Sequence, residues 1–213
     1  MRLAAALAFA SISFGSQAFA GIDNPLLVNL GTTANGFGNP TFATSWTQSI
    51  GYTGVSIVAY LSTSLSSGGG TAYLTTAIGA GTTSAAEVTS PFEFGVTGST
   101  PHSVALFNNL TLAAGTYYLV LAGPAVGSNS FSWAGDGDAT DAFTGPGVTA
   151  GSNYTTSGGP VAYGPARSFN ASNIGLEVLV AGTPVSVSVP EPSALVVLGS
   201  ALAGLMFARR RRI

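Results

Sequence analysis

The sequence predicts an all-β fold, an antiparallel β-sandwich or jelly roll, flanked by an N-terminal signal peptide and a C-terminal transmembrane helix. In the central part of the chain, apolar residues recur with a period of two, the pattern of strands that bury one face. Clusters of Gly, Pro, Ser and Asn interrupt this pattern at short intervals, as turns between short strands do. Apolar runs at both ends of the chain are of a different kind and are explained by membrane passage.

Residues 1–20 have the pattern of a secretory signal peptide. Arg2 supplies a positive start, and Leu3–Phe14 is an apolar stretch broken only by two serines. Ala18 and Ala20 place small residues where signal peptidase requires them. We therefore expect export through the Sec machinery and cleavage by signal peptidase before Gly21.

Residues 21–188 are long enough for one extracellular β-sandwich domain with a sizeable core. In Gly54–Leu61, four apolar side chains fall on one face of a strand, and Thr116–Ala122 is a near-continuous apolar run typical of a strand buried on both sides. Breaks are expected at the glycine-rich stretches 68–70, 79–84, 95–101, 123–127 and 145–159. Eight further strands are expected at Leu26–Leu30, Thr44–Ile50, Thr71–Ile78, Phe92–Val96, Ser103–Leu110, Asn129–Trp133, Leu176–Val180 and Val185–Val189.

The segment Leu110–Leu121 predicts a turn at Ala114–Gly115 between two strands. It resembles a hairpin with the pattern L-x-x-G-x-Y-x-L-x-V that occurs in bacterial extracellular sandwich domains, including jelly-roll modules and pre-peptidase C-terminal domains. The matching residues are Leu112, Gly115, Tyr117 and Leu119, with Leu121 in place of the valine.

Charge and cysteine content exclude several classes of function. Charged residues make up 7% of the chain, against about 25% in an average soluble protein. Residues 21–188 contain one base, Arg167, and seven acids, a net charge of −6. Such a domain cannot neutralise a phosphate backbone, so nucleic acid is excluded as a partner. The absence of cysteine excludes disulfides, thiol catalysis and thiolate metal sites.

The sequence offers little catalytic machinery, and we expect a protein that is not an enzyme. Its single histidine, His102, follows Pro101 in a turn-like stretch, and no G-x-S-x-G motif occurs. Glu87 and Glu93 could form the carboxylate pair of a glycosidase. Such a pair requires a defined separation across a cleft, which the sequence does not establish.

Two sets of residues each have a binding interpretation and a structural one. Asp136, Asp138 and Asp141 form the densest group of hard oxygen ligands, either an irregular calcium site or a solvated acidic loop. They do not fit an EF-hand loop, which requires Gly where Asp141 stands. Trp46 and Trp133 are either core residues or stacking platforms for sugar rings.

The C-terminal segment 189–213 has three parts. Val189, Pro190, Glu191 and Pro192 form an extended corner, because the two prolines fix φ and remove two backbone donors. The uncharged run 193–208 suits a transmembrane helix of about 24 Å, short for the ~30 Å hydrocarbon core. The basic tail 209–212, which consists of Arg209, Arg210, Arg211 and Arg212, stops transfer and stays in the cytoplasm.

This segment resembles the PEP-CTERM sorting signal of Gram-negative envelope proteins. The resemblance implies recognition by exosortase, a membrane protease-transpeptidase, while the run 193–208 holds the precursor transiently in the inner membrane. It further implies passage to the cell surface or extracellular matrix, and we expect a non-enzymatic protein associated with exopolysaccharide or biofilm. The alternatives are a carbohydrate-binding β-sandwich that uses Trp46, Trp133 or exposed tyrosines, with or without calcium, and an ice- or surface-adsorbing protein.

Overall fold

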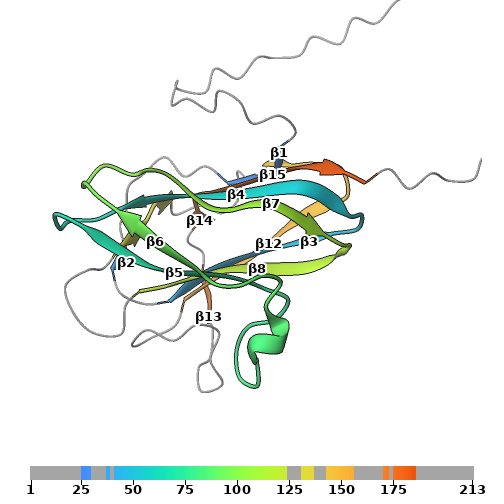
Figure 1. Ribbon diagram of the computed structural model, residues 1–213, viewed down its shortest axis with the longest axis horizontal. Helices are drawn as coiled ribbons and strands as arrows, with labels where there is room; N and C mark the ends of the chain where they lie inside the picture. Colours follow the sequence, from blue (N-terminus) through green and yellow to red (C-terminus); the bar gives the residue numbers. More distant parts are fainter. Residues whose placement is uncertain are drawn as a thin grey trace, which may run out of the picture.

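The computed structural model describes residues 25–29, 37–38, 41–123, 131–136, 143–155, 170–172 and 175–185. These residues form two antiparallel sheets packed face to face (Figure 1). An all-β sandwich is therefore confirmed. The described residues contain no helix that is long and apolar enough to cross a membrane. The predicted signal peptide and the run 193–208 lie outside these residues.

The first sheet has seven strands in the order β11-β1-β15-β4-β9-β2, with β7 also paired to β4. Its members are β1 (Pro25–Asn29), β2 (Phe37–Gly38), β4 (Tyr52–Ser62), β7 (His102–Leu112), β9 (Ser132–Trp133), β11 (Phe143–Thr144) and β15 (Val178–Pro184). The second sheet has six strands in the order β13-β12-β3-β8-β5-β6. Its members are β3 (Phe42–Gln48), β5 (Gly68–Thr75), β6 (Phe92–Val96), β8 (Gly115–Ala122), β12 (Val148–Thr155) and β13 (Asn170–Ser172).

Two short strands, β10 (Gly135–Asp136) and β14 (Gly175–Leu176), pair with each other, and one 3₁₀ turn, η1 (Ser84–Ala86), follows β5. The loop around η1 is tied to the edge of β5, because the amide of Val88 donates to the carbonyl of Leu74 at 2.8 Å and Thr75 forms a bridge with Glu87. Residues 87–88 of this loop therefore pair with β5 next to β6 and extend the second sheet there.

Eight strands pair in a nested way along the chain. Taken in chain order as β1, β3, β4, β5, β6, β7, β8 and β15, the first pairs with the last and the second with the seventh. The third pairs with the sixth and the fourth with the fifth, so that the chain behaves as one long hairpin folded over on itself. Because the pairs alternate between the sheets, almost every connection crosses from one sheet to the other.

This pairing corrects the hairpin expected around Ala114–Gly115. β7 and β8 follow one another closely but lie in opposite sheets, β7 against β4 and β8 between β3 and β5. The Leu112–Gly115 segment is thus a connection between sheets. Gly115 is absent from the positive-φ residues among those described, so its place there does not depend on left-handed backbone.

Most expected strands are present, but the stretch 145–159 was wrongly expected to be a break. It contains β12, eight residues long, whose pairing with β3 shifts register between Ala150 and Asn153. This irregularity interrupts the alternation that a period-two search detects. The last expected strand is Val185–Val189. Its first residue, Val185, is not in a strand, because β15 ends at Pro184, and residues 186–189 lie outside the described part.

The glycine-rich start of β5 was likewise expected to be a break and is a strand. A Cβ added to Gly69 would lie 2.3 Å from the carbonyl oxygen of Phe94, and one added to Gly70 would lie 2.4 Å from that of Ala122. Neighbouring backbones approach so closely here that a side chain would push the strands apart. These glycines therefore permit tight pairing and do not mark a turn.

Candidate functional site

The two tryptophans lie in the core between the sheets, and this corrects the hypothesis that they stack on sugars. Both are 0% exposed. Trp46 stacks on Tyr117 with ring centroids 5.7 Å apart, and the indole N–H of Trp133 donates to the carbonyl of Glu177 at 2.8 Å. A ring without an exposed face cannot receive a ligand, so any binding site must use other side chains.

A buried glutamine organises the end of the core next to Trp46. Gln48 is 1% exposed; its Oε1 accepts from the Trp46 indole at 3.1 Å, and its Nε2 donates to the carbonyl of Ala113 at 2.8 Å. The same Nε2 lies 3.2 Å from the carbonyl of Ile50 and 3.3 Å from that of Leu112. One amide group thus satisfies polar groups from two turns and from the core.

Replacing Gln48 with leucine is expected to lower the free energy of unfolding, because it leaves the buried indole N–H of Trp46 without an acceptor. The expected loss is about 1–3 kcal/mol for that group, measured by urea denaturation. A matched control is Thr47→Val, since Thr47 is exposed on the opposite face of β3 and should change stability by less than about 0.5 kcal/mol. Equal effects in the two variants would contradict this role for Gln48.

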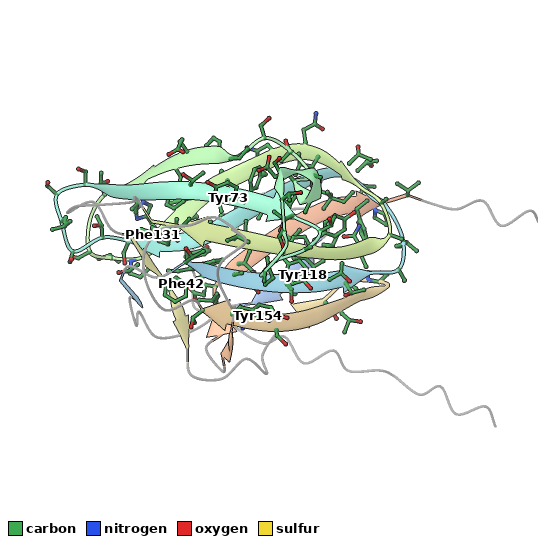
Figure 2. The ribbon with its side chains drawn as sticks, turned by 90° about the horizontal axis from the view of Figure 1, so that it is seen from below. Phe42, Tyr73, Tyr118, Phe131 and Tyr154 are labelled. Carbon is green, nitrogen blue, oxygen red and sulfur yellow. The ribbon has the colours of Figure 1, made fainter. Side chains whose placement is uncertain are left out.

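Three tyrosines lie on the outer face of the six-stranded sheet, the side seen in Figure 2. We call Tyr73, Tyr118 and Tyr154 the tyrosine face. Tyr154 pairs with Ala43, Ala43 with Val120 and Val120 with Tyr73, which places these residues in one row across β12, β3, β8 and β5. Each of the three tyrosines is partly exposed, whereas Ala43 and Val120 between them are fully buried.

Tyr118 joins this row because it lies two residues from Val120 on β8, on the same face of the strand. Its ring centroid is 6.0 Å from that of Tyr154, with planes inclined by 53°. Burial raises the pKa of Tyr118, and the nearby Tyr154 raises it further. The Tyr118 phenol therefore stays protonated at neutral pH and can donate a hydrogen bond.

Tyr73, at the other end of the row, lies between two acidic side chains. Thr71 pairs with Glu93 across β5 and β6 and donates its hydroxyl to Glu93 Oε1 at 2.7 Å, while Thr75 forms a bridge with Glu87. Burial raises the pKa of Tyr73, the hydrogen bond with Thr71 lowers it in part, and the charges of Glu93 and Glu87 raise it. Glu93 and Glu87 give this end of the face an acidic character among the described residues, which include no lysine or arginine.

A row of threonines adds hydroxyl groups to the same face. Thr149 pairs with Thr47, and Thr47 pairs with Thr116, in register across β12, β3 and β8. The hydroxyls of Thr47 and Thr116 are 2.9 Å apart. The outer face thus combines flat aromatic side chains with neutral donors and acceptors.

The tyrosine face was not located from the sequence. The strands that carry Tyr73 and Tyr118 were expected, but β12, which carries Tyr154, was not. Within β5 and β8, each tyrosine alternates with the core residues beside it, and this signal marks an outward position. Which outward positions come together depends on the order β12-β3-β8-β5, in which no two neighbours are consecutive in the chain.

Among the described residues, no group of three or more His, Cys, Asp or Glu side chains is placed to hold a metal. The backbone of Asp136 pairs with Gly175, but Asp138 and Asp141 lie outside the described residues, so the proposed calcium loop stays a prediction. His102 is exposed at the start of β7, with its Nδ1 3.3 Å from the carbonyl oxygen of Thr100.

The fold and the C-terminal segment together define an exported β-sandwich protein with a sorting signal. Residues 188–212 match the family model of the PEP-CTERM protein-sorting motif. The chain therefore carries a PEP-CTERM sorting signal in residues 188–212, and this motif implies exosortase-dependent sorting of an exported protein. The match covers the tail and leaves the sandwich unassigned. No curated protein and no solved structure matches the chain.

Proposed function

We propose that this protein is a non-enzymatic component of the extracellular matrix whose sandwich binds polysaccharide through the tyrosine face. The sorting signal supports delivery beyond the inner membrane. The observation that carries the binding proposal is the row Tyr154–Ala43–Val120–Tyr73, with Tyr118 beside it, on one outer face. Flat aromatic rings flanked by hydroxyl groups suit sugar rings, which present both apolar and hydrogen-bonding surfaces.

The topology supports the same proposal. The nested pairing of eight strands, first with last and fourth with fifth, is the arrangement expected of a jelly roll, a double-sheet architecture that lectins also use. β12 extends the second sheet beyond β3 and brings Tyr154 to the face. We infer that the sandwich is a jelly roll. A fold does not imply a function, so the class of ligand is inferred from the side chains of the tyrosine face.

The dimensions of the face favour an extended glycan. Tyr154 and Tyr73 are three strands apart, a separation of about 14 Å at the usual strand spacing. This span suits several sugar units of a chain better than a single ring. The acidic residues beside Tyr73 make anionic polysaccharides poor ligands and favour neutral or amino-sugar polymers.

Substituting Tyr118 with alanine is expected to weaken binding to such a glycan about tenfold, the loss typical of a central contact residue. The measurement is affinity electrophoresis of residues 21–188 in gels containing neutral, amino-sugar or anionic polysaccharide, with calcium and with chelator. Phe92→Ala is the matched control, since Phe92 is 41% exposed but lies outside the tyrosine face.

Equal retention of the wild type and the Tyr118→Ala variant on every polysaccharide would contradict the proposed face. Retention that disappears with chelator in both proteins would instead assign binding to the acidic loop at Asp136, Asp138 and Asp141. If none of the polysaccharides retains the wild-type protein, the carbohydrate-binding proposal is wrong.

A further inference from the structure

The end of β15 fixes where the sorting tail leaves the sandwich. Pro184 pairs with Tyr52 at the start of β4, and the amide of Val185 donates to the carbonyl of Gly51 at 2.8 Å. The tail therefore begins beside the β3–β4 turn. Two other turns lie at this end, because Gln48 bonds to Ala113 and the Ser49 amide donates to Gly147 at 2.7 Å. We call residues 49–51, 113–114 and 145–147 the tail-side end.

The opposite end is a full strand length away. β4 runs from Tyr52 to Ser62, 11 residues, or about 36 Å at the usual rise per residue. The register with β7 confirms the direction, since Tyr52 pairs with Leu112 and Leu61 with His102. The β4–β5 connection, residues 63–67, thus lies at the end remote from the tail, and the two ends are visible at opposite sides of Figure 1.

The chain between the sandwich and the predicted membrane run is short compared with this length. Eight peptide steps separate Val185 from Ser193, and they reach at most about 26–29 Å when fully extended. Part of that reach is used within the headgroup layer, which is about 5–8 Å deep on each side. A body inverted on the membrane would need its tether to cover the whole ~36 Å of the sandwich, which is beyond its reach.

From this geometry we infer that the tail-side end is the membrane-facing surface of the precursor, tethered close to the lipid headgroups until exosortase acts. The inference rests on the sorting signal and on the predicted membrane run 193–208, and it is independent of the glycan proposal. It gives the sandwich a fixed orientation relative to the membrane, with residues 63–67 at the end that faces away from the bilayer. It also confines the processing enzyme to the gap between the sandwich and the membrane.

The chemistry of the tail-side end fits a lipid surface. Its residues are Ser49, Ile50, Gly51, Ala113, Ala114, Gly145, Pro146 and Gly147, and none carries a charge. Residues 21–188 have a net charge of −6, and anionic lipids repel acidic groups that lie within about one Debye length, ~8–10 Å. The uncharged end can approach such a bilayer at a lower cost than the outer face of the six-stranded sheet, where Glu93 and Glu87 lie beside Tyr73.

The test uses single cysteines, which the cysteine-free chain makes specific. Full-length precursor with Ala114→Cys or Ser67→Cys is labelled with a fluorophore in membrane vesicles from a host without exosortase. The vesicles contain lipids that carry a nitroxide quencher on the headgroup. Both positions are exposed, so labelling should leave the fold intact. We expect loss of fluorescence at position 114 and little loss at position 67.

A second arm lengthens the tether. Inserting a long Gly/Ser spacer after Val185 should remove most of the quenching at position 114 without changing the sandwich. Ser49→Cys repeats the measurement at another turn of the same end if Ala114→Cys fails to fold. Equal quenching at both ends, or quenching at position 114 only when exosortase is added, would overturn the inference; the latter result would assign the contact to the enzyme.

Discussion

Replacing Pro190, Glu191 and Pro192 together with alanine is expected to stop processing, so that the protein accumulates as its full-length precursor in the inner-membrane fraction. Because prolines fix φ and remove backbone donors, the sequence predicts that this corner is extended and outside regular secondary structure. Alanine removes both constraints and, next to an apolar run, favours continuation of a helix. The exosortase would then meet neither the extended shape nor the carboxylate of Glu191.

The measurement is an immunoblot of fractionated cells with an antibody against the sandwich. Pro184→Ala is the matched control, because Pro184 is an exposed proline at the end of β15, six residues before Pro190. The control should be processed and delivered like the wild type. Unchanged size and location of the triple variant would contradict the sorting role of the motif.

The strands of the sandwich could be predicted from the sequence where the pleat is regular. In β4, alternate residues Val55, Ile57, Ala59 and Leu61 are all 0% exposed, so the period-two signal is uninterrupted. In β12, the register shift between Ala150 and Asn153 places Gly151 against Ser45, where a Cβ would lie 2.2 Å from the Ser45 hydroxyl. The small residues that this close contact requires resemble a loop in the sequence.

The order of the strands and the tyrosine face could not be predicted in the same way. Alternation assigns a residue to a face but does not say which strand lies next to it. Tyr73 and Val120 are neighbours in the second sheet although 47 positions separate them in the sequence. The same limit applies to the tryptophans, because a large aromatic residue in a strand-like pattern suits the core and a binding surface equally well until the opposing sheet is known.

The nested pairing also explains why the tail can be attached to a stable support. β15, the last strand that the structure describes, lies between β1 and β4; residues 178–181 pair with both neighbours, and Thr183 and Pro184 pair with β4. Tension on the tail is therefore resisted by two sets of backbone hydrogen bonds. A tail that followed an edge strand could detach that strand more easily and lengthen its own tether.

Replacing Trp133 with alanine is expected to lower the free energy of unfolding by about 3–5 kcal/mol, the range for removing a buried large aromatic residue. Trp133 is 0% exposed, and its loss leaves a cavity between the sheets. The carbonyl of Glu177 keeps a donor, because the amide of Tyr60 lies 3.3 Å from it. The expected cost thus comes from packing and not from an unsatisfied acceptor. The free energy of unfolding of a folded domain is only about 5–15 kcal/mol, so this single substitution is expected to remove a large fraction of it.

Thermal and urea denaturation of residues 21–188 would measure this loss. Phe92→Ala is the control for a partly exposed aromatic residue at the edge of the core, and it should cost clearly less than Trp133→Ala. Trp46→Phe and Trp133→Phe provide a sharper comparison. The first leaves Gln48 Oε1 buried without its donor and should cost about 1–3 kcal/mol more than the second, whose acceptor stays bonded. If the Trp133 variant were as stable as the wild type but no longer bound polysaccharide, the residue would be a ligand contact and its assignment to the core would be wrong.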